Sequence, residues 1–279
     1  MYQKYSMYIL NKKGQELYYD LLNFNSDLPV VVFLNGLSQT TESWSLIVNR
    51  FINDYRIVLL DFVFQGKSSH DGEWKNFDEH AEDVYLIVEH LKIDKFNLVG
   101  ISYGSLVGQN FAVNYPHKLN TITLLSTFAN KSQYYNVIEN SWEKALDKGG
   151  AELLFDVMLP FVLSDNYFNN PLIPIEVIKS AKKNLNQTIS LSKLMKATIN
   201  RDDYRKELNK IKIPTLILHG EKDLLFPVSF GLDVSNNIPN SVFIVIQNVG
   251  HTLNLEGIDE VYFNIKKFID YHENSINNR

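Results

Sequence analysis

The sequence predicts an α/β protein with a doubly wound, mostly parallel sheet and an inserted helical cap. Short apolar runs of strand length alternate with amphipathic helical patterns on either side of a gap, as expected for a sheet covered by helices on both faces. The gap, from residue 128 to about residue 205, has helical patterns and no convincing strand. We therefore expect a core of residues 1–127 and 206–279 and a cap of residues 128–205.

Composition excludes several classes of function. The 279 residues are 45% hydrophobic and 21% charged, which suits a globular protein with a sizeable core. A net charge of −5 argues against a nucleic-acid partner. Because there is no cysteine, disulfides, thiolate catalysis and cysteine-bound metals are excluded. No signal peptide is visible, and no apolar run approaches the roughly 18 residues of a membrane span. We expect a cytoplasmic monomer or homodimer with no membrane partner.

The first elements follow from short apolar runs and turn residues. Residues 5–10 and 17–22 flank the turn sequence Asn11-Lys12-Lys13-Gly14 and predict an antiparallel hairpin at a sheet edge. Residues 30–34 form a continuous apolar run, typical of a strand buried on both faces. The other elements predicted in this half are a helix over about 42–52, a strand over 56–60 and a helix over 77–91.

A Gly100-x-Ser102-x-Gly104 sequence lies between an apolar run that starts at Phe96 and a helical pattern that continues to Tyr115. A serine at a sharp strand-to-helix turn stands exposed above the sheet, at the positive end of a helix dipole. Glycines two residues to either side leave room for the close packing. The alternative is a glycine-rich turn without a catalytic role, and other motifs in the chain are needed to distinguish the two interpretations.

The second half repeats the alternation around the gap. Pro171 and Pro174 break the helical patterns of the gap near its middle. Most aromatic residues there are expected to form the insertion's own core, and a few, with Phe128, Trp142 and Phe161 as candidates, to line a cavity. The remaining predicted elements are strands over 119–125, 213–218 and 241–246 and a closing helix over 260–272.

An activated serine needs a base, and the base needs an acid to orient it. Asp223 follows the strand that ends near residue 218, and His251 follows the strand that ends at residue 246. Both loops are predicted at the same sheet edge as Ser102. Glu221 is the competing acid, but it is nearer the strand, and His219 ends that strand and is expected to be structural. We therefore expect Ser102, His251 and Asp223 to act together.

With these motifs in place, the chain resembles the α/β-hydrolase superfamily, in its capped serine esterase, lactonase and C–C hydrolase branch, over almost its full length. The resemblance implies that Ser102 is the nucleophile, His251 the general base and acid, and Asp223 its orienting partner. It also implies an oxyanion hole made of the Leu37 and Tyr103 amides, and no metal or cofactor. The matching residues are Asn35-Gly36, Asp61 with Gly66 and Ser68, Gly100-x-Ser102-x-Gly104, Gly220-Glu221-Lys222-Asp223 and Gly250-His251.

The chain departs from the family pattern near the expected site. Asn35 stands where the family usually has histidine, and Phe62-Val63-Phe64 occupies a loop that commonly carries arginine and glycine. Since the expected oxyanion donor is a backbone amide, neither departure removes a catalytic group. Asn35, Phe62 and Phe64 join the candidates for the substrate pocket, where apolar side chains would narrow the entrance.

These residues predict a hydrolase for a small-molecule substrate, a carboxylic ester, lactone or thioester with an apolar acyl part. The same three residues also support C–C bond hydrolysis, so the triad cannot separate the two reactions. A small-molecule receptor with low turnover, or an acyltransferase or lyase, are the alternatives from other classes. Product analysis separates them, because a hydrolase releases a free acid.

Overall fold

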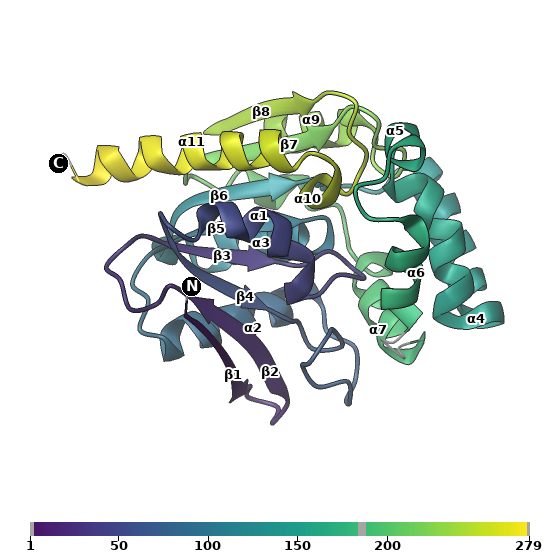
Figure 1. Cartoon of the computed structure of the whole chain (residues 1–279), viewed down its shortest axis with the longest axis horizontal. Coiled ribbons are helices and arrows are strands. Elements are labelled where there is room, and N and C mark those ends of the chain that lie inside the picture. The colour runs from purple at the N-terminus through teal and green to yellow at the C-terminus, as the bar shows by residue number, and fades with distance from the viewer. Residues whose placement is uncertain (1–2, 184–187, 278–279) are drawn as a thin grey trace.

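Eight strands form one sheet in the computed structural model, which describes residues 3–183 and 188–277 (Figure 1). The strand order is β1-β2-β4-β3-β5-β6-β7-β8. β2 pairs antiparallel with β1 and with β4, and the strands from β4 to β8 pair in parallel. This confirms the predicted mostly parallel sheet. The strands are β1 (Lys4–Leu10), β2 (Glu16–Leu22), β3 (Val30–Leu34), β4 (Arg56–Leu60), β5 (Phe96–Ile101), β6 (Leu119–Leu125), β7 (Thr215–Gly220) and β8 (Ser241–Ile246).

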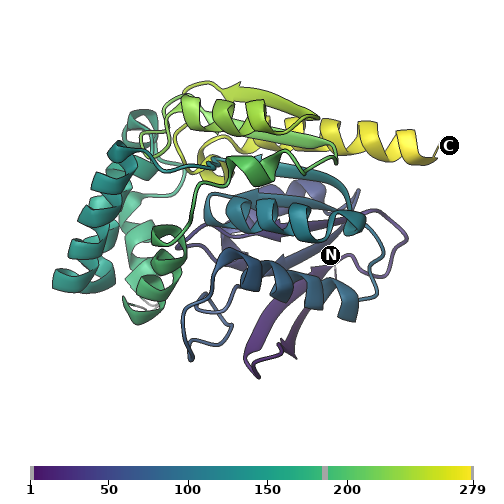
Figure 2. The ribbon, with the colours of Figure 1, turned by 180° about the vertical axis from the view of Figure 1, so that it is seen from behind.

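Helices cover both faces of the sheet, so the doubly wound arrangement is also confirmed. α1 and α11 lie on one face, and α2, α3 and α9 on the other (Figures 1 and 2). The helices are η1 (Thr41–Trp44), α1 (Ser45–Phe51), α2 (Phe77–His90), α3 (Tyr103–Asn114), η2 (Pro116–Lys118), α4 (Gln133–Val162), α5 (Asp165–Asn169), α6 (Ile175–Lys183), α7 (Thr188–Ile199), α8 (Arg205–Leu208), α9 (Val228–Asn237), α10 (Leu253–Glu256) and α11 (Ile258–Asn277).

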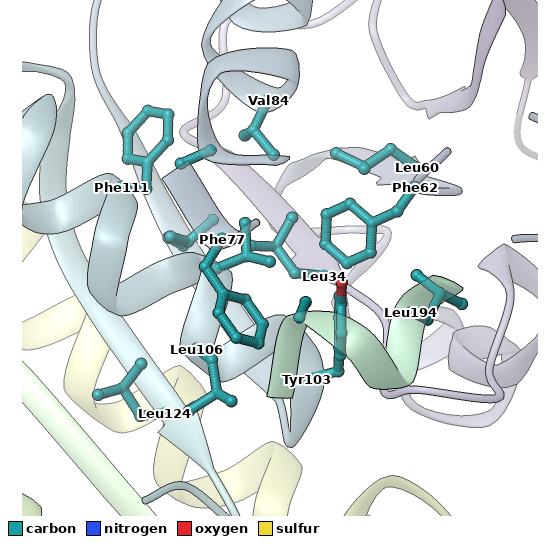
Figure 3. Close-up of a cluster of buried hydrophobic side chains, with 14 of the residues drawn as sticks. Leu34, Leu60, Phe62, Phe77, Val84, Tyr103, Leu106, Phe111, Leu124 and Leu194 are labelled. Atoms are coloured by element: carbon teal, nitrogen blue, oxygen red, sulfur yellow. The ribbon is translucent and has the colours of Figure 1, made fainter. Parts of the chain in front are cut away.

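The buried strands explain this layering. In β3, Val31 and Phe33 belong to the core layer under α1 and α11, whereas Val32 and Leu34 belong to the layer under α2 and α3. Side chains of a strand point alternately to opposite faces, so an unbroken apolar run supplies both layers at once. Figure 3 shows part of the second layer, which includes Leu34 of β3, Leu60 of β4 and Leu106 of α3.

A helical insertion, α4 to α7, follows β6 and stands at one end of the sheet (Figure 1), and α8, which packs against α3 and α9, leads from it to β7. Pro171 and Pro174 fall between α5 and α6, as their inability to continue a helix predicts. α4 is broken at Gly150, whose φ of 63° and ψ of −159° are not helical. Residues 184–187 of the expected cap, and residues 1–2 and 278–279 of the expected core, lie outside the described residues.

Some elements differ from the sequence expectation. The helix expected over 42–52 is divided into η1 and α1, and the closing helix runs from Ile258 to Asn277 instead of 260–272. α9 and α10 were not expected. α9 contains Gly231, a poor helix former, and is held by packing of that glycine against His219 and Phe243. Among the described residues, no helix is long and apolar enough to cross a bilayer.

Candidate active site

Ser102 lies at a strained turn between β5 and α3. Its φ of 50° and ψ of −115° are rare for a residue with a side chain, and its N–H donates to the Leu125 carbonyl at 2.9 Å. The two flanking glycines are required by close packing. A Cβ at Gly100 would lie 2.4 Å from the Gly104 carbonyl oxygen, and one at Gly104 would lie 2.3 Å from the Leu34 carbonyl oxygen. The sequence therefore folds here into the turn that exposes the serine.

His251 connects Ser102 to Asp223. Its Nε2 is 2.9 Å from Ser102 Oγ, and its Nδ1 is 2.8 Å from Asp223 Oδ2. The second carboxylate oxygen of Asp223 accepts from the backbone N–H groups of Leu225 and Phe226, at 3.0 and 2.8 Å. A carboxylate held in this way fixes the imidazole tautomer, with Nδ1–H donating to Asp223 and Nε2 free to accept the serine proton.

The structure separates Asp223 from the competing acid. Glu221 is exposed and accepts from the Asn248 N–H at 3.0 Å, on the outside of the loop. His219 is fully buried, its Nε2 donates to the Phe226 carbonyl at 2.6 Å, and burial lowers its pKa. A buried neutral histidine with a carbonyl partner supports the loop that carries Asp223, as expected of a structural residue.

Leu37 and Tyr103 both line the pocket at Ser102. Tyr103 is the first residue of α3, so its N–H has no carbonyl partner within the helix. The loop of Leu37 is held from below by Gln65, whose Nε2 donates to the carbonyls of Gly36 at 2.8 Å and Leu37 at 3.2 Å. Gln65 was not among the expected site residues, although it lies within the Asp61–Ser68 segment that carries the family resemblance.

Asn35 lies beneath this loop and is fully buried. Its amide donates to the Leu60 carbonyl at 2.8 Å and to Asp61 at 3.2 Å, and its side-chain oxygen accepts from Trp44 Nε1 at 2.9 Å. Asn35 is therefore placed to hold the oxyanion-side loop rather than to touch a substrate.

Asp61 organises the segment next to that loop. Its carboxylate accepts from the N–H groups of Thr41 at 2.8 Å and Lys67 at 2.9 Å, and burial raises its pKa. Gly66 has a φ of +47°, and a Cβ there would lie 2.0 Å from the Asp61 carboxylate. The Asp61 carboxylate therefore lies so close to the backbone of residue 66 that only glycine fits there.

The apolar residues 62–64, which differ from the family pattern, are buried in the hydrophobic core. Phe62 is fully buried, and its ring centroid is 5.9 Å from that of Tyr103 (Figure 3). Phe64 is also buried and borders a small hollow with Phe155 and Leu191 of the insertion. These rings support the floor of the site and the insertion above it.

A small pocket of about 70 Å³ opens at Ser102 between the sheet edge and the insertion. Of the candidates for the substrate pocket, Phe128 and Trp142 line this space and Phe161 does not, although its ring centroid is 6.5 Å from that of Trp142. Most of the lining is apolar. The lining residues are Gly36, Leu37, Ser38, Gln39, Ile101, Ser102, Tyr103, Leu106, Phe128, Tyr135, Trp142, Met158, Val162, Thr198, Leu225, Phe226, His251 and Thr252.

The insertion is hydrogen-bonded to the loop of His251. The Val162 carbonyl at the end of α4 accepts from the N–H of Thr252 at 3.1 Å and from its hydroxyl at 2.8 Å. The partly buried carboxylate of Glu256 accepts from the N–H groups of Ser164 at 3.0 Å and Gly250 at 3.2 Å, and burial raises its pKa. Neither Thr252 nor Glu256 was expected, because both act through contacts between segments far apart in sequence.

A serine at a strand-to-helix turn, followed in chain order by an acid and a histidine, on a sheet of this topology, defines a class of hydrolases. A family model described as "alpha/beta hydrolase fold" matches residues 29–150 and 182–258. The chain belongs to the α/β-hydrolase family.

Three similar proteins illustrate the range of this family. A proline iminopeptidase of Lactobacillus crispatus is 23% identical, with 93% of this chain and 96% of the relative covered. A 2-hydroxy-6-oxo-6-phenylhexa-2,4-dienoate hydrolase of Burkholderia cepacia is 26% identical, over 90% of this chain and 91% of the relative. The crystal structure of an enol-lactonase from Burkholderia xenovorans superposes with a TM-score of 0.85, at 21% identity, over 95% and 100% of the two chains. At 21% identity, this structural similarity supports the fold but not a shared activity.

Proposed function

We propose that this protein is a serine hydrolase that cleaves a carboxylic ester, lactone or thioester with an apolar acyl part. The observation that carries the proposal is the hydrogen-bonded chain from Asp223 through His251 to Ser102, with contacts of 2.8 and 2.9 Å. The substrate is a small molecule, and the reaction uses no metal or cofactor. The names of the relatives, an iminopeptidase and a dienoate hydrolase, support hydrolysis but not one substrate class.

The geometry supports a two-step acyl transfer. Ser102 Oγ attacks the carbonyl carbon while His251 Nε2 accepts the hydroxyl proton, and Asp223 stabilises the imidazolium that forms. The N–H groups of Leu37 and Tyr103 donate to the oxyanion. The leaving-group oxygen takes the proton from His251 and departs. Water then attacks the acyl-enzyme with His251 as the base, and the free acid is released.

The pocket supports the apolar acyl part. Phe128, Trp142, Met158 and Phe226 form walls around the serine, and the imidazole of His251 packs edge-on against Phe226 at a centroid distance of 5.4 Å. An apolar enclosure excludes water from the reacting carbonyl, which strengthens the hydrogen bonds to the oxyanion.

Hydrolysis of a C–C bond is the second candidate, because one relative is named as a dienoate hydrolase. C–C bond hydrolysis would use the same three residues as ester hydrolysis, so only the products distinguish the two reactions. An ester hydrolase releases an acid and an alcohol, whereas a C–C hydrolase releases an acid and a carbon fragment. A receptor with slow turnover would retain its ligand without either product.

The test is release of nitrophenol from nitrophenyl esters by the wild type and by Ser102→Ala. We expect the variant to lose activity by a factor of about 10⁴ or more, since the nucleophile is lost. Its thermal unfolding should match the wild type, which shows that the fold is kept. Full activity in the folded variant would refute the proposal.

A further inference from the structure

A second hollow, of about 380 Å³, lies beside the pocket at Ser102. We call it the α6 groove, because α6 forms its outer wall. Its apolar walls come from Leu46 of α1 on one side and, on the other, from residues of α4, of α6 and of the segment between them. The apolar residues that define it here are Leu46, Leu159, Leu163, Ile173, Val177 and Ile178.

The α6 groove and the Ser102 pocket adjoin. The residues that line both hollows are Ser38, Gln39, Met158, Val162 and Thr252. Ser38 and Gln39 directly follow Leu37 in the expected oxyanion loop, and Thr252 directly follows His251. A molecule with its carbonyl at Ser102 therefore has the groove within reach, between the expected oxyanion loop and the loop of the histidine.

The Ser102 pocket is too small to hold a whole organic substrate, whereas the α6 groove is large enough for most of one. Pockets that hold organic ligands have volumes of about 300–1,000 Å³. The space at Ser102, about 70 Å³, is well below this range, whereas the α6 groove, about 380 Å³, is within it. The reacting carbonyl and a short acyl group fit the first space, and the larger part of the substrate needs the second.

We propose that the α6 groove binds the alcohol part of the substrate, so that the enzyme prefers short acyl esters of long or aryl alcohols. This inference rests on the proposed function. His251 Nε2 gives its proton to the leaving oxygen as the C–O bond breaks, so the alcohol departs from the side of the histidine. Thr252, the next residue, lines the groove where it adjoins the Ser102 pocket, and the apolar walls of the groove fit an alkyl or aryl chain.

The test compares two isomeric esters, hexyl acetate and ethyl hexanoate. They have the same atoms and differ only in which side of the ester carries the long chain. A single methylene in an apolar pocket changes kcat/KM by about 10-fold or more, so we expect hexyl acetate to be preferred by at least about 10-fold. Preference for ethyl hexanoate, or equal rates, would overturn the groove assignment while Ser102-dependent hydrolysis would still support the proposed function.

Val177→Trp places a large ring in the groove from α6, where Val177 is 52% exposed. We expect the ratio of kcat/KM for hexyl acetate to that for ethyl acetate to fall by about 10-fold. Glu176→Trp is the matched control, because Glu176 is the exposed neighbour on the same helix and the ratio should not change. An unchanged ratio in Val177→Trp would contradict the inference.

A binding measurement tests the α6 groove independently of catalysis. Octanol added to the Ser102→Ala protein should shift the NMR methyl signals of Val177, Ile178 and Leu159, and Val177→Trp introduced into that protein should weaken the binding. If neither ester is cleaved, the proposed function fails for simple esters, and these shifts alone support the groove. Methyl signals that do not move with octanol would overturn it.

Discussion

The two acids after β7 have opposite surroundings, which makes their roles separable. Asp223 is 3% exposed and lies 2.8 Å from His251, whereas Glu221 is exposed and bonded to the backbone of residue 248. We expect Asp223→Asn to lower kcat by about 10⁴-fold, because the amide favours the wrong imidazole tautomer. Glu221→Gln should stay within about 3-fold of the wild type. Rates with one nitrophenyl ester test both, and a larger loss in Glu221→Gln would reverse the assignment.

Gln65 acts on the site through the backbone of Gly36 and Leu37. Gln65→Met removes both hydrogen bonds to that loop, so we expect the Leu37 amide to be displaced and kcat to fall by about 10- to 100-fold with a smaller change in KM. Gln15→Met is the control, because Gln15 is also buried and hydrogen-bonded but lies far from Ser102 in the fold. Equal losses of kcat in the two variants would show a general effect of stability.

At the scale of elements, the contact between β3 and α3 holds the nucleophile turn. An alanine Cβ at Gly104 would meet the Leu34 backbone at 2.3 Å, so Gly104→Ala has to separate the helix from the strand. We expect a loss of about 3 kcal/mol or more in unfolding free energy, measured with urea. An alanine Cβ at Gly108 on the same helix would contact only side-chain methyl groups, those of Ile122, Leu98 and Leu124 at 3.3–3.5 Å, so Gly108→Ala should cost much less. Similar losses at both positions would contradict this.

Most elements were predictable because their signals are local. The apolar run of β3, the period of α2 and the glycines around Ser102 each lie within a few residues of what they predict. The positions of β4 and β8 agree with prediction to the residue. α9 was missed because its glycine and its serines disfavour a helix and tertiary packing overrides them. The break of α4 at Gly150 was missed because a glycine in a helical pattern does not by itself predict a break.

At the scale of the whole molecule, two buried histidines couple folding to pH. Burial lowers the pKa of His80 well below its ordinary value of 6.5 and also lowers that of His219. The unfolded chain then binds protons that the folded protein does not, so stability is lost as the pH falls from 6.5 toward the folded pKa values. The loss is at most about 1.4 kcal/mol per histidine per pH unit.

His80→Leu isolates this effect. Both ring nitrogens of His80 lack hydrogen-bond partners among the described residues, so leucine removes a polar group without breaking a bond. The buried carboxyls, whose raised pKa values act in the opposite direction, are unchanged in the comparison. We expect the stability gain of His80→Leu to increase as the pH falls below 6.5, measured by urea unfolding at several pH values. A gain that is independent of pH would refute the assignment.

The candidate site was only partly predictable for a related reason. Chain order and the shared edge of parallel strands bring Ser102, Asp223 and His251 together, and both can be inferred from sequence. The support from Gln65 and the shape of the α6 groove depend on how the loop after β3 and the insertion meet. Such contacts join segments that carry no common pattern, so the sequence did not indicate that Asn35 and Phe62 would be buried beneath the site.

α4 touches both loops that carry the histidine and its acid. Near its start, the Tyr134 hydroxyl donates to the Leu224 carbonyl at 2.7 Å, next to Asp223, and at its end the Val162 carbonyl holds Thr252, next to His251. The insertion is therefore not an exchangeable module. A chimera that received the insertion of another family member would need matching partners at both junctions. Without these partners, the loops of His251 and Asp223 would be misaligned even if the new insertion bound its own substrate. Exchange of insertions within this family should therefore succeed when the contacting residues of both loops are exchanged together with the insertion.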